Sequence, residues 1–303
     1  MIQMILLTGF LGAGKTTLLN HLYDYFDGTK MGVIVNEFGE INIDARLLKK
    51  DGVTISELSN GSIFCACIKE NFIKSLIEMS SYDIEYLFIE ASGLADPSNM
   101  DQILCTIGGQ TPHPYHYAGS VCVLDGEAFM ELYNLLPAVR NQLVYAGAVV
   151  VNKEDLISPA VREEIQAEIR SVNPDATVYF TSFCNVDVRE LIQQINPSGV
   201  QGGESSNTVE SRPQTFVVKV LPSITMEEFK DFLHYISPFT YRIKGFVTVG
   251  SHSYSVSGVR THIMILPWSS EIPASEIVLI SAVGIGLTGA LANGLKTNPS
   301  LGV

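Results

Sequence analysis

A glycine-rich segment near the start of the chain constrains the fold more than any other stretch of the sequence. Residues 7–18 read LTGFLGAGKTTL, which places Gly9, Gly14, Lys15 and Thr16 at the G-x-x-x-x-G-K-[ST] spacing of a P-loop. An apolar run precedes this segment and an apolar-periodic segment follows it, so the order is strand, loop and helix. Glycines let the backbone curl so that successive N–H groups converge on phosphate oxygens, and the helix N-terminus adds partial positive charge. The segment therefore predicts a loop that binds the phosphates of a nucleoside triphosphate.

The organisation of the remaining chain predicts two domains. Apolar strands alternate with amphipathic helices as far as residue 197, which predicts an α/β domain: a P-loop NTPase parallel sheet flanked by helices, over residues 1–197. Residues 198–212 are rich in glycine and serine and poor in apolar side chains, which is typical of a linker. Residues 213–303 contain several strand patterns and a pair of helices, so we expect a smaller C-terminal α+β domain with an antiparallel sheet.

Composition restricts the class of partner. The net charge is −13, which argues against a nucleic-acid partner, and the 46% of hydrophobic residues excludes a disordered chain. No apolar run reaches the roughly 18 residues of a membrane helix, and no basic leader precedes the first strand, so we expect a cytoplasmic protein without a membrane partner. The five cysteines are an odd number, which favours free thiols or metal ligands over a disulfide framework.

Polar residues at the ends of two strands predict the Mg²⁺ side of the nucleotide site. Glu37 follows one apolar strand, and Glu90 closes another, with Gly93 three positions later. In P-loop enzymes an acidic residue at such a strand end holds Mg²⁺, and a glycine N–H beyond it senses the γ-phosphate. We expect Glu37 and Glu90 to lie near Mg²⁺, with the Thr16 hydroxyl as a further ligand.

A second motif selects the base. A hydrophobic strand ends in Asn152, Lys153 and Asp155, the N-K-x-D pattern that reads guanine. We expect the Asp155 carboxylate to accept from the guanine N1 and N2 hydrogens, while Asn152 and the stem of Lys153 bracket the ring. Thr181 and Ser182 follow the next strand and are expected to form the backbone loop that closes over the base. A small-molecule P-loop kinase, the alternative interpretation of the phosphate loop, has no need of this tetrad.

Cys65 and Cys67 form a separate candidate site. Cysteines at i and i+2 of an extended segment project to the same side, so both thiolates reach one borderline ion such as Zn²⁺. Two thiolates leave a tetrahedral site half filled, and small cysteines are also common in protein cores, so the spacing leaves both interpretations open. His113 and His116 are likewise either chelating or ordinary surface histidines, in a segment that Pro112 and Pro114 predict as a loop.

Five segments in this order resemble one known family. GFLGAGKTTLLNHL, VNEFGEINID, ELSNGSIFCAC, IEASGLADP and VNKEDL together resemble the CobW-like metallochaperone GTPases, relatives of the nickel-insertion GTPases that serve urease and hydrogenase. The resemblance covers residues 1–197. It implies hydrolysis of GTP to GDP with Mg²⁺, and a nucleotide-gated site that delivers Zn²⁺, Co²⁺ or Ni²⁺ to a client metalloprotein or a cobalamin pathway.

The resemblance also implies roles for individual positions. The residues that bind phosphate and Mg²⁺ are Gly12, Ala13, Gly14, Lys15, Thr16 and Thr17. The implied catalytic residues are Lys15, Glu37, Glu90 and Gly93, and the implied guanine site is Asn152, Lys153, Asp155, Thr181 and Ser182. The implied transition-metal ligands are Cys65 and Cys67, and Ile68 stands where the family's C-x-C-C motif has a further cysteine.

Two functions follow from these motifs. In the first, the protein is a metallochaperone. Loss of the γ-phosphate releases the loop at residues 36–44, and this movement shifts the two cysteines and changes the number of metal ligands. A homodimer in which two C-x-C pairs supply four thiolates would complete the site. In the alternative, the protein is a GTP-dependent interaction switch that activates a corrinoid or metalloenzyme without carrying metal itself.

Overall fold

In a computed structural model of the protein, the apolar runs predicted as strands between residues 1 and 196 pair into one parallel sheet. The structure describes residues 1–36, 54–58, 69–93, 95–196, 214–272, 274–298 and 300–302. The strands are β1 (Ile2–Thr8), β2 (Met31–Asn36), β3 (Thr54–Leu58), β4 (Tyr86–Glu90), β5 (Tyr115–Asp125), β6 (Ala148–Asn152) and β7 (Thr177–Phe180). Their order is β3-β2-β4-β1-β5-β6-β7, and every described pair is parallel. The carboxyl ends of all seven strands therefore meet at one edge, where open parallel sheets bind ligands.

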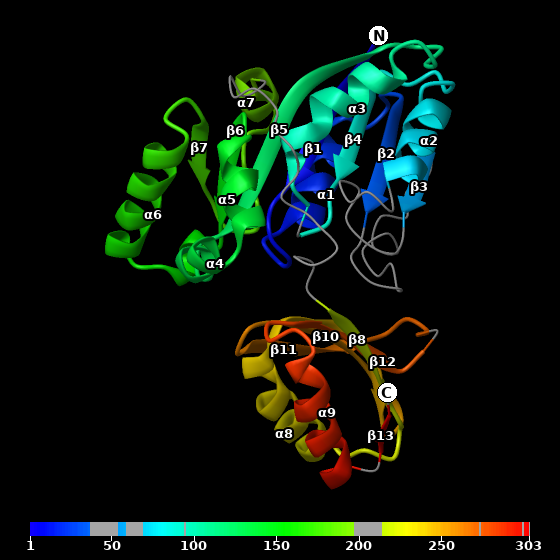
Figure 1. Ribbon diagram of the computed structural model, residues 1–303, viewed down its shortest axis with the longest axis vertical. Helices are drawn as coiled ribbons and strands as arrows, with labels where there is room; N and C mark the ends of the chain where they lie inside the picture. Colours follow the sequence, from blue (N-terminus) through cyan, green and yellow to red (C-terminus); the bar gives the residue numbers. More distant parts are fainter. Residues whose placement is uncertain are drawn as a thin grey trace. The chain divides into compact units, whose positions relative to one another are not determined.

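Helices cover both faces of this sheet (Figure 1). They are α1 (Lys15–Tyr25), α2 (Lys69–Met79), α3 (Met100–Ile107), α4 (Phe129–Leu135), α5 (Pro137–Val144), α6 (Pro159–Val172) and α7 (Val188–Gln194), with short 3-10 turns η2 (Pro97–Asn99) and η3 (Glu154–Leu156). Alternate β1 side chains point to opposite faces: Ile5 and Leu7 pack in the core with α1 and α7, whereas Met4 and Leu6 pack with α2 and α3. Burial on both faces explains why the strands are continuous apolar runs.

The rest of the chain forms a separate compact unit with its own core. The two units comprise residues 1–211 and 212–303. The second sheet has the order β11-β10-β9-β12-β8-β13, and its described pairs are antiparallel. Its elements are β8 (Thr215–Val220), α8 (Met226–Ile236), η4 (Ser237–Phe239), β9 (Thr240–Val249), β10 (His252–Val259), β11 (His262–Trp268), β12 (Glu276–Ser281), α9 (Gly286–Thr297) and β13 (Leu301–Gly302). Helices α8 and α9 pack on one face of the sheet through side chains such as Phe229 and Leu291.

The predicted fold class is confirmed, and several local predictions are corrected. Strand β5 begins at Tyr115, so His116 lies on a strand and not in the loop that the flanking prolines predicted. Helices α3, α4 and α5 lie in a segment for which the sequence carried no helix prediction. The predicted linker, at residues 198–212, lies outside the described residues, as do Glu37, Cys65 and Cys67. No helix in the described part of the chain is long and apolar enough to cross a membrane.

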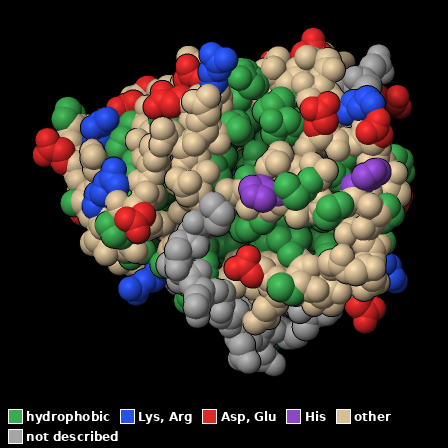
Figure 2. All heavy atoms as spheres, turned by 90° about the horizontal axis from the view of Figure 1, so that it is seen from above, with side chains coloured by type: hydrophobic (Ala, Val, Ile, Leu, Met, Phe, Trp, Pro, Cys, Tyr) green, Lys and Arg blue, Asp and Glu red, His purple; other side chains and the backbone are tan. Residues whose placement is uncertain are grey.

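Charged side chains of both signs are scattered over the face of the molecule shown in Figure 2. On that face, among the side chains drawn in colour, Lys and Arg lie singly between Asp and Glu, with apolar side chains among them. Recognition of nucleic-acid phosphates uses lysines and arginines gathered into a patch or stripe. The coloured part of this face carries no such stripe.

Candidate nucleotide site

The loop between β1 and α1 is shaped by three glycines in the left-handed region. Gly9, Gly12 and Gly14 have φ angles of 128°, 79° and 117°, which side-chain-bearing residues rarely adopt. A Cβ atom on Gly9 would lie 2.0 Å from the Val123 carbonyl oxygen, and one on Gly14 would lie 2.5 Å from Asn152 Nδ2. Gly9 and Gly14 are therefore required both by backbone conformation and by the close approach of neighbouring strands and loops.

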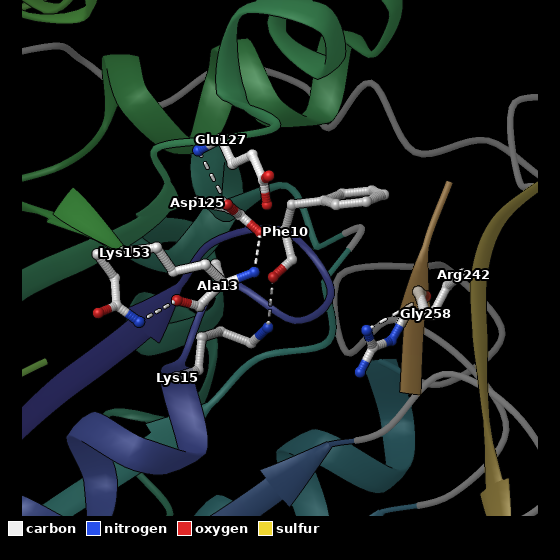
Figure 3. A network of polar contacts seen from close by, with 9 residues as sticks. Phe10, Ala13, Lys15, Asp125, Glu127, Lys153, Arg242 and Gly258 are labelled. Atoms are coloured by element: carbon white, nitrogen blue, oxygen red, sulfur yellow. Dashed lines mark hydrogen bonds and ion pairs between the residues drawn. The ribbon is translucent and has the colours of Figure 1, made fainter. Parts of the chain in front are cut away.

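This loop ends at the N-terminus of α1, whose N-cap residue supplies no side-chain cap. Gly14 is the N-cap residue of α1 and, as a glycine, has no side chain that could accept a hydrogen bond from the helix. The first N–H groups of a helix have no partner within the helix itself. Lys15 is 7% exposed, and its Nζ donates to the carbonyl oxygens of Gly9 (3.0 Å) and Phe10 (3.1 Å), as Figure 3 shows for Phe10. A buried ammonium beside an uncapped N-terminus attracts anions, so the loop fits phosphate groups.

Two side-chain oxygen groups lie together next to this loop. Thr16 Oγ1 donates to Glu90 Oε1 over 2.7 Å, and Glu90 is 3% exposed at the carboxyl end of β4, the strand adjacent to β1. A hydroxyl and a carboxylate are the kinds of ligand that Mg²⁺ prefers, so this donor set fits Mg²⁺. Burial, and then the negative charge of Glu90, raise the pKa of Tyr23 to about 12, so this neighbouring phenol stays neutral.

The segment that follows β4 packs directly against the phosphate loop. A Cβ atom on Gly93 would lie 2.5 Å from the backbone nitrogen of Leu11, so only glycine allows this approach. The structure thus brings Gly93 against the loop that precedes Lys15 and Thr16, and its contact with the γ-phosphate stays a prediction. Glu37, the other predicted Mg²⁺ ligand, falls outside the described residues.

Two loops at the ends of β6 and β7 are joined by hydrogen bonds. Glu154 N donates to the Thr181 carbonyl oxygen (3.0 Å), and Asp155 N donates to Ser182 Oγ (3.2 Å). The side chain of Asp155 is exposed. The two loops therefore form one hydrogen-bonded surface segment, in which Thr181 is buried and the side chain of Asp155 is exposed.

Asn152 connects this surface to the phosphate loop. Its Nδ2 donates to the Ala13 carbonyl oxygen (2.8 Å), and its Oδ1 accepts from Cys184 N (2.9 Å). The sequence predicted that this amide brackets the guanine ring. In the structure its donor and acceptor hold two loops together, and contact with the guanine ring stays a prediction.

Lys153 is held by a residue that the sequence interpretation missed. Its backbone has a φ of 63°, and its Nζ forms an ion pair with Asp125 Oδ2 at 2.5 Å (Figure 3). Asp125 is buried at the end of β5, and its Oδ1 accepts from Glu127 N. The signal was present in the sequence, because Asp125 closes a hydrophobic strand in the same way as Glu90.

Comparison with known proteins agrees with this geometry. The family described as CobW/HypB/UreG, nucleotide-binding domain, matches residues 3–180. The chain belongs to this family. The resemblance predicted from the sequence motifs is therefore confirmed.

Individual members of the CobW/HypB/UreG family are similar over part of the chain. The "Zinc chaperone YjiA" of Escherichia coli (strain K12) is 31% identical over 224 residues, 70% of this chain and 66% of that protein. The "Zinc-regulated GTPase metalloprotein activator 1" of Dictyostelium discoideum is 27% identical over 223 residues, 61% of this chain and 47% of that protein. The chain thus spans between about half and two thirds of the length of these curated relatives. A solved structure of Zn(II)-bound YjiA GTPase from E. coli is similar with a TM-score of 0.49 and 22% identity, covering 96% of this chain and 98% of that one.

In this family member the loop after β7 has an unusual backbone. Phe183 and Cys184 both have positive φ, at 57° and 53°, which costs energy for residues with a side chain. The Phe183 carbonyl oxygen lies 2.9 Å from His21 Nε2, and the Cys184 thiol donates to the Gly14 carbonyl oxygen at 3.4 Å. Contacts from α1 and from the phosphate loop therefore hold the strained pair in place.

We expect the cysteines of the nucleotide-binding domain to differ in reactivity. Burial raises the pKa of both Cys122 and Cys184 to about 12, so at pH 8 both remain protonated and unreactive, whereas Cys105 is exposed. Brief treatment of the native protein with iodoacetamide, followed by peptide mass spectrometry, should modify Cys105 and leave Cys122 and Cys184 intact. Denaturant should make all three react, and modification of Cys184 at the rate of Cys105 in the native protein would contradict the prediction.

The described residues contain no group of three or more His, Cys, Asp and Glu placed to hold a metal ion. Cys65 and Cys67 are not among those residues. His113 Nδ1 lies 2.9 Å from the Ser80 carbonyl oxygen, and His116 Nδ1 lies 2.9 Å from Gln3 Oε1. The two imidazoles thus contact different elements of the fold.

Proposed function

We propose that this member of the CobW/HypB/UreG family binds GTP with Mg²⁺ and hydrolyses it to GDP and phosphate. The observation that carries the proposal is the 2.7 Å contact between Thr16 and Glu90 beside the buried Lys15. A glycine-rich loop, a cation and two oxygen groups of the kind that Mg²⁺ prefers thus lie at one edge of the sheet, which supports the proposal. The N-K-x-D segment is anchored to the same loop through Asn152 and Ala13, which supports guanine as the base.

The part of the site that binds the phosphates is proposed to act by stabilising the negative charge on the phosphate oxygens. Backbone N–H groups of the phosphate loop would hold the phosphates. These N–H groups belong to Gly12, Ala13, Gly14, Lys15, Thr16 and Thr17. Lys15 would contact the β- and γ-phosphates, and Thr16 with Glu90 and Glu37 would hold Mg²⁺, which neutralises charge developing on the phosphate oxygens. The Gly93 N–H would contact the γ-phosphate, because Gly93 lies against Leu11 of the same loop.

The base end is proposed to work by hydrogen bonding. The exposed Asp155 carboxylate would accept from guanine N1 and N2, and adenine lacks this pair of donors in that arrangement. Since Asp125 holds the Lys153 ammonium, the stem of Lys153 would lie along the ring. Thr181 and Ser182 would close over the base, because they are bonded to the loop that carries Asp155.

We also propose that nucleotide turnover is coupled to delivery of Zn²⁺ to a client metalloprotein. Family membership supports this function, as do the relatives described as a zinc chaperone and as a zinc-regulated GTPase metalloprotein activator. Cys65 and Cys67 would bind the ion as thiolates, and two copies of the chain would supply the four thiolates of a tetrahedral site. Because the thiols must lose protons, metal affinity should rise with pH.

Metal binding and nucleotide binding should be measured together. Wild type, the double variant Cys65→Ala/Cys67→Ala and the control Cys105→Ala are dialysed against buffered Zn²⁺ with GDP or with a non-hydrolysable GTP analogue. We expect nucleotide-dependent Zn²⁺ binding in wild type and control, and its loss in the double variant. Equal zinc in wild type and double variant would overturn the metal function. It would favour the interaction switch, an outcome consistent with Ile68 at the position where the family has a further cysteine.

A further inference from the structure

Helix α5 holds the backbone on both sides of residue 94. The Nε2 atom of Gln142 donates to the carbonyl oxygens of Gly93 (3.2 Å) and Ala95 (2.8 Å). Gln142 is 0% exposed, so neither bond competes with solvent. One buried amide group from α5 thus fixes the direction of two peptide carbonyls in the segment that follows β4.

The neighbouring residue of the same helix makes a second attachment. Asn141 Nδ2 donates to Asp96 Oδ2 at 3.0 Å, and Asp96 is itself 0% exposed. Asp96 Oδ1 accepts from Ser98 N at 3.1 Å and thereby begins the 3-10 turn η2. Consecutive side chains of α5 therefore hold the segment at Gly93, Ala95 and Asp96, and the helix and the segment form one packed unit.

Buried polar atoms without partners gather at this segment. Within the described residues, four such atoms are Ser92 Oγ, Ser98 Oγ, Asn99 Oδ1 and Gln142 Oε1. Buried polar atoms without partners are rare in native structures, so each such group calls for an explanation. Three of these residues are in the segment itself and the fourth is the glutamine that holds it.

Gly93 lies between this attachment and the phosphate loop. Its missing Cβ would be 2.5 Å from Leu11 N, while its carbonyl oxygen accepts from Gln142. Glycine has a wider range of backbone conformations than any other residue. The bond from Gln142 restricts this range, because it holds the peptide carbonyl of Gly93 in one direction.

We infer that Gln142 is a positioning residue for recognition of the γ-phosphate. By holding the carbonyls of Gly93 and Ala95, it keeps the Gly93 backbone in the orientation that distinguishes a nucleoside triphosphate from a diphosphate. Helix α5 leads directly into β6, at whose end Asn152 contacts the phosphate loop. Gln142 thus lies on the helix that precedes the strand carrying Asn152. The inference rests on the proposed binding of GTP.

The test replaces Gln142 by methionine, which has a similar length and no donor. Dissociation constants are measured for GDP and for a non-hydrolysable GTP analogue, and kcat and KM are measured for GTP. We expect the affinity for the analogue and kcat each to fall about ten-fold, with the GDP dissociation constant changed less than about two-fold, because one or two buried hydrogen bonds are lost. Retention of the wild-type ratio of analogue to GDP affinity would overturn the inference.

Asn173→Leu is the matched structural control. Asn173 Nδ2 donates to the carbonyl oxygens of Leu143 and Ala146 at the end of α5, so its loss destabilises the same helix without touching the Gly93 segment. It should leave the ratio of analogue to GDP affinity unchanged, and an equal effect of both variants would contradict a positioning role.

If Gln142→Met does not fold, Asn141→Ser, at a half-buried position, is expected to change the ratio in the same direction, and an unchanged ratio would overturn the inference. Wild type that binds no guanine nucleotide would instead refute the proposed function.

Discussion

Replacing Asp155 by asparagine is expected to change the nucleotide preference of the protein from GTP to xanthosine triphosphate. In the proposed guanine site the Asp155 carboxylate would accept two hydrogen bonds from the base, and hydrogen bonds to a charged group contribute about 1.5–3 kcal/mol each, so GTP affinity should fall about 10²–10⁴-fold. Xanthine carries a carbonyl at C2, to which the new amide donates, while the amide oxygen accepts from N1. Binding of both nucleotides, measured by isothermal titration calorimetry, checks the prediction.

The fold should tolerate this substitution. The Asp155 side chain is exposed, and the bond that anchors the loop to Ser182 Oγ comes from the Asp155 backbone nitrogen, which asparagine retains. Asp175→Asn removes one exposed negative charge in the turn before β7 and serves as the matched control, with unchanged GTP affinity expected. A weaker GTP complex without any gain for the xanthine nucleotide would show that Asp155 acts through charge alone. A GTP affinity equal to that of wild type would show that the base lies elsewhere.

Motif spacing predicted the residues of the site that are encoded over short stretches of sequence. Gly14, Lys15 and Thr16 are adjacent, and their roles follow from loop and helix geometry that a few residues determine. Glu90 was found because strands of a parallel sheet end at a common edge, so a polar residue that closes an apolar run is placed near the loop. The same reasoning identifies Asp125, which was overlooked.

Contacts between distant segments were not predictable in this way. Asn152 lies 139 positions from Ala13, and Gln142 lies 49 positions from Gly93, so no local pattern indicates either bond. One weak signal exists for Gln142. Helix α5 buries Ala138, Val139 and Leu143 together with it, and a glutamine within a buried stripe requires hydrogen-bond partners. The sequence indicates that such partners exist, but only the packing of α5 against the segment after β4 identifies them.

Replacing Lys15 by alanine is expected to abolish measurable GTP hydrolysis. In the structure the Lys15 ammonium is buried and lies within the curve of the phosphate loop, where its charge acts in a medium of low polarity. Removing one preorganised group that stabilises transition-state charge lowers kcat about 10²–10³-fold, and Lys15 also contributes to ground-state binding of the phosphates. Phosphate release under single-turnover conditions, with the protein in excess over GTP and saturating Mg²⁺, measures the loss.

The control for Lys15 is Lys30→Ala, which removes the same side chain from the surface. Lys30 is exposed and pairs with the exposed Asp83, a kind of ion pair that contributes little to stability. Hydrolysis by this variant should match wild type. Lys15→Arg should fail to restore activity, because the planar guanidinium is larger and cannot reproduce the contacts of the ammonium with the Gly9 and Phe10 carbonyls. Wild-type turnover in Lys15→Ala would mean that the charge which stabilises the transition state is supplied by another residue, and that the phosphate loop only binds.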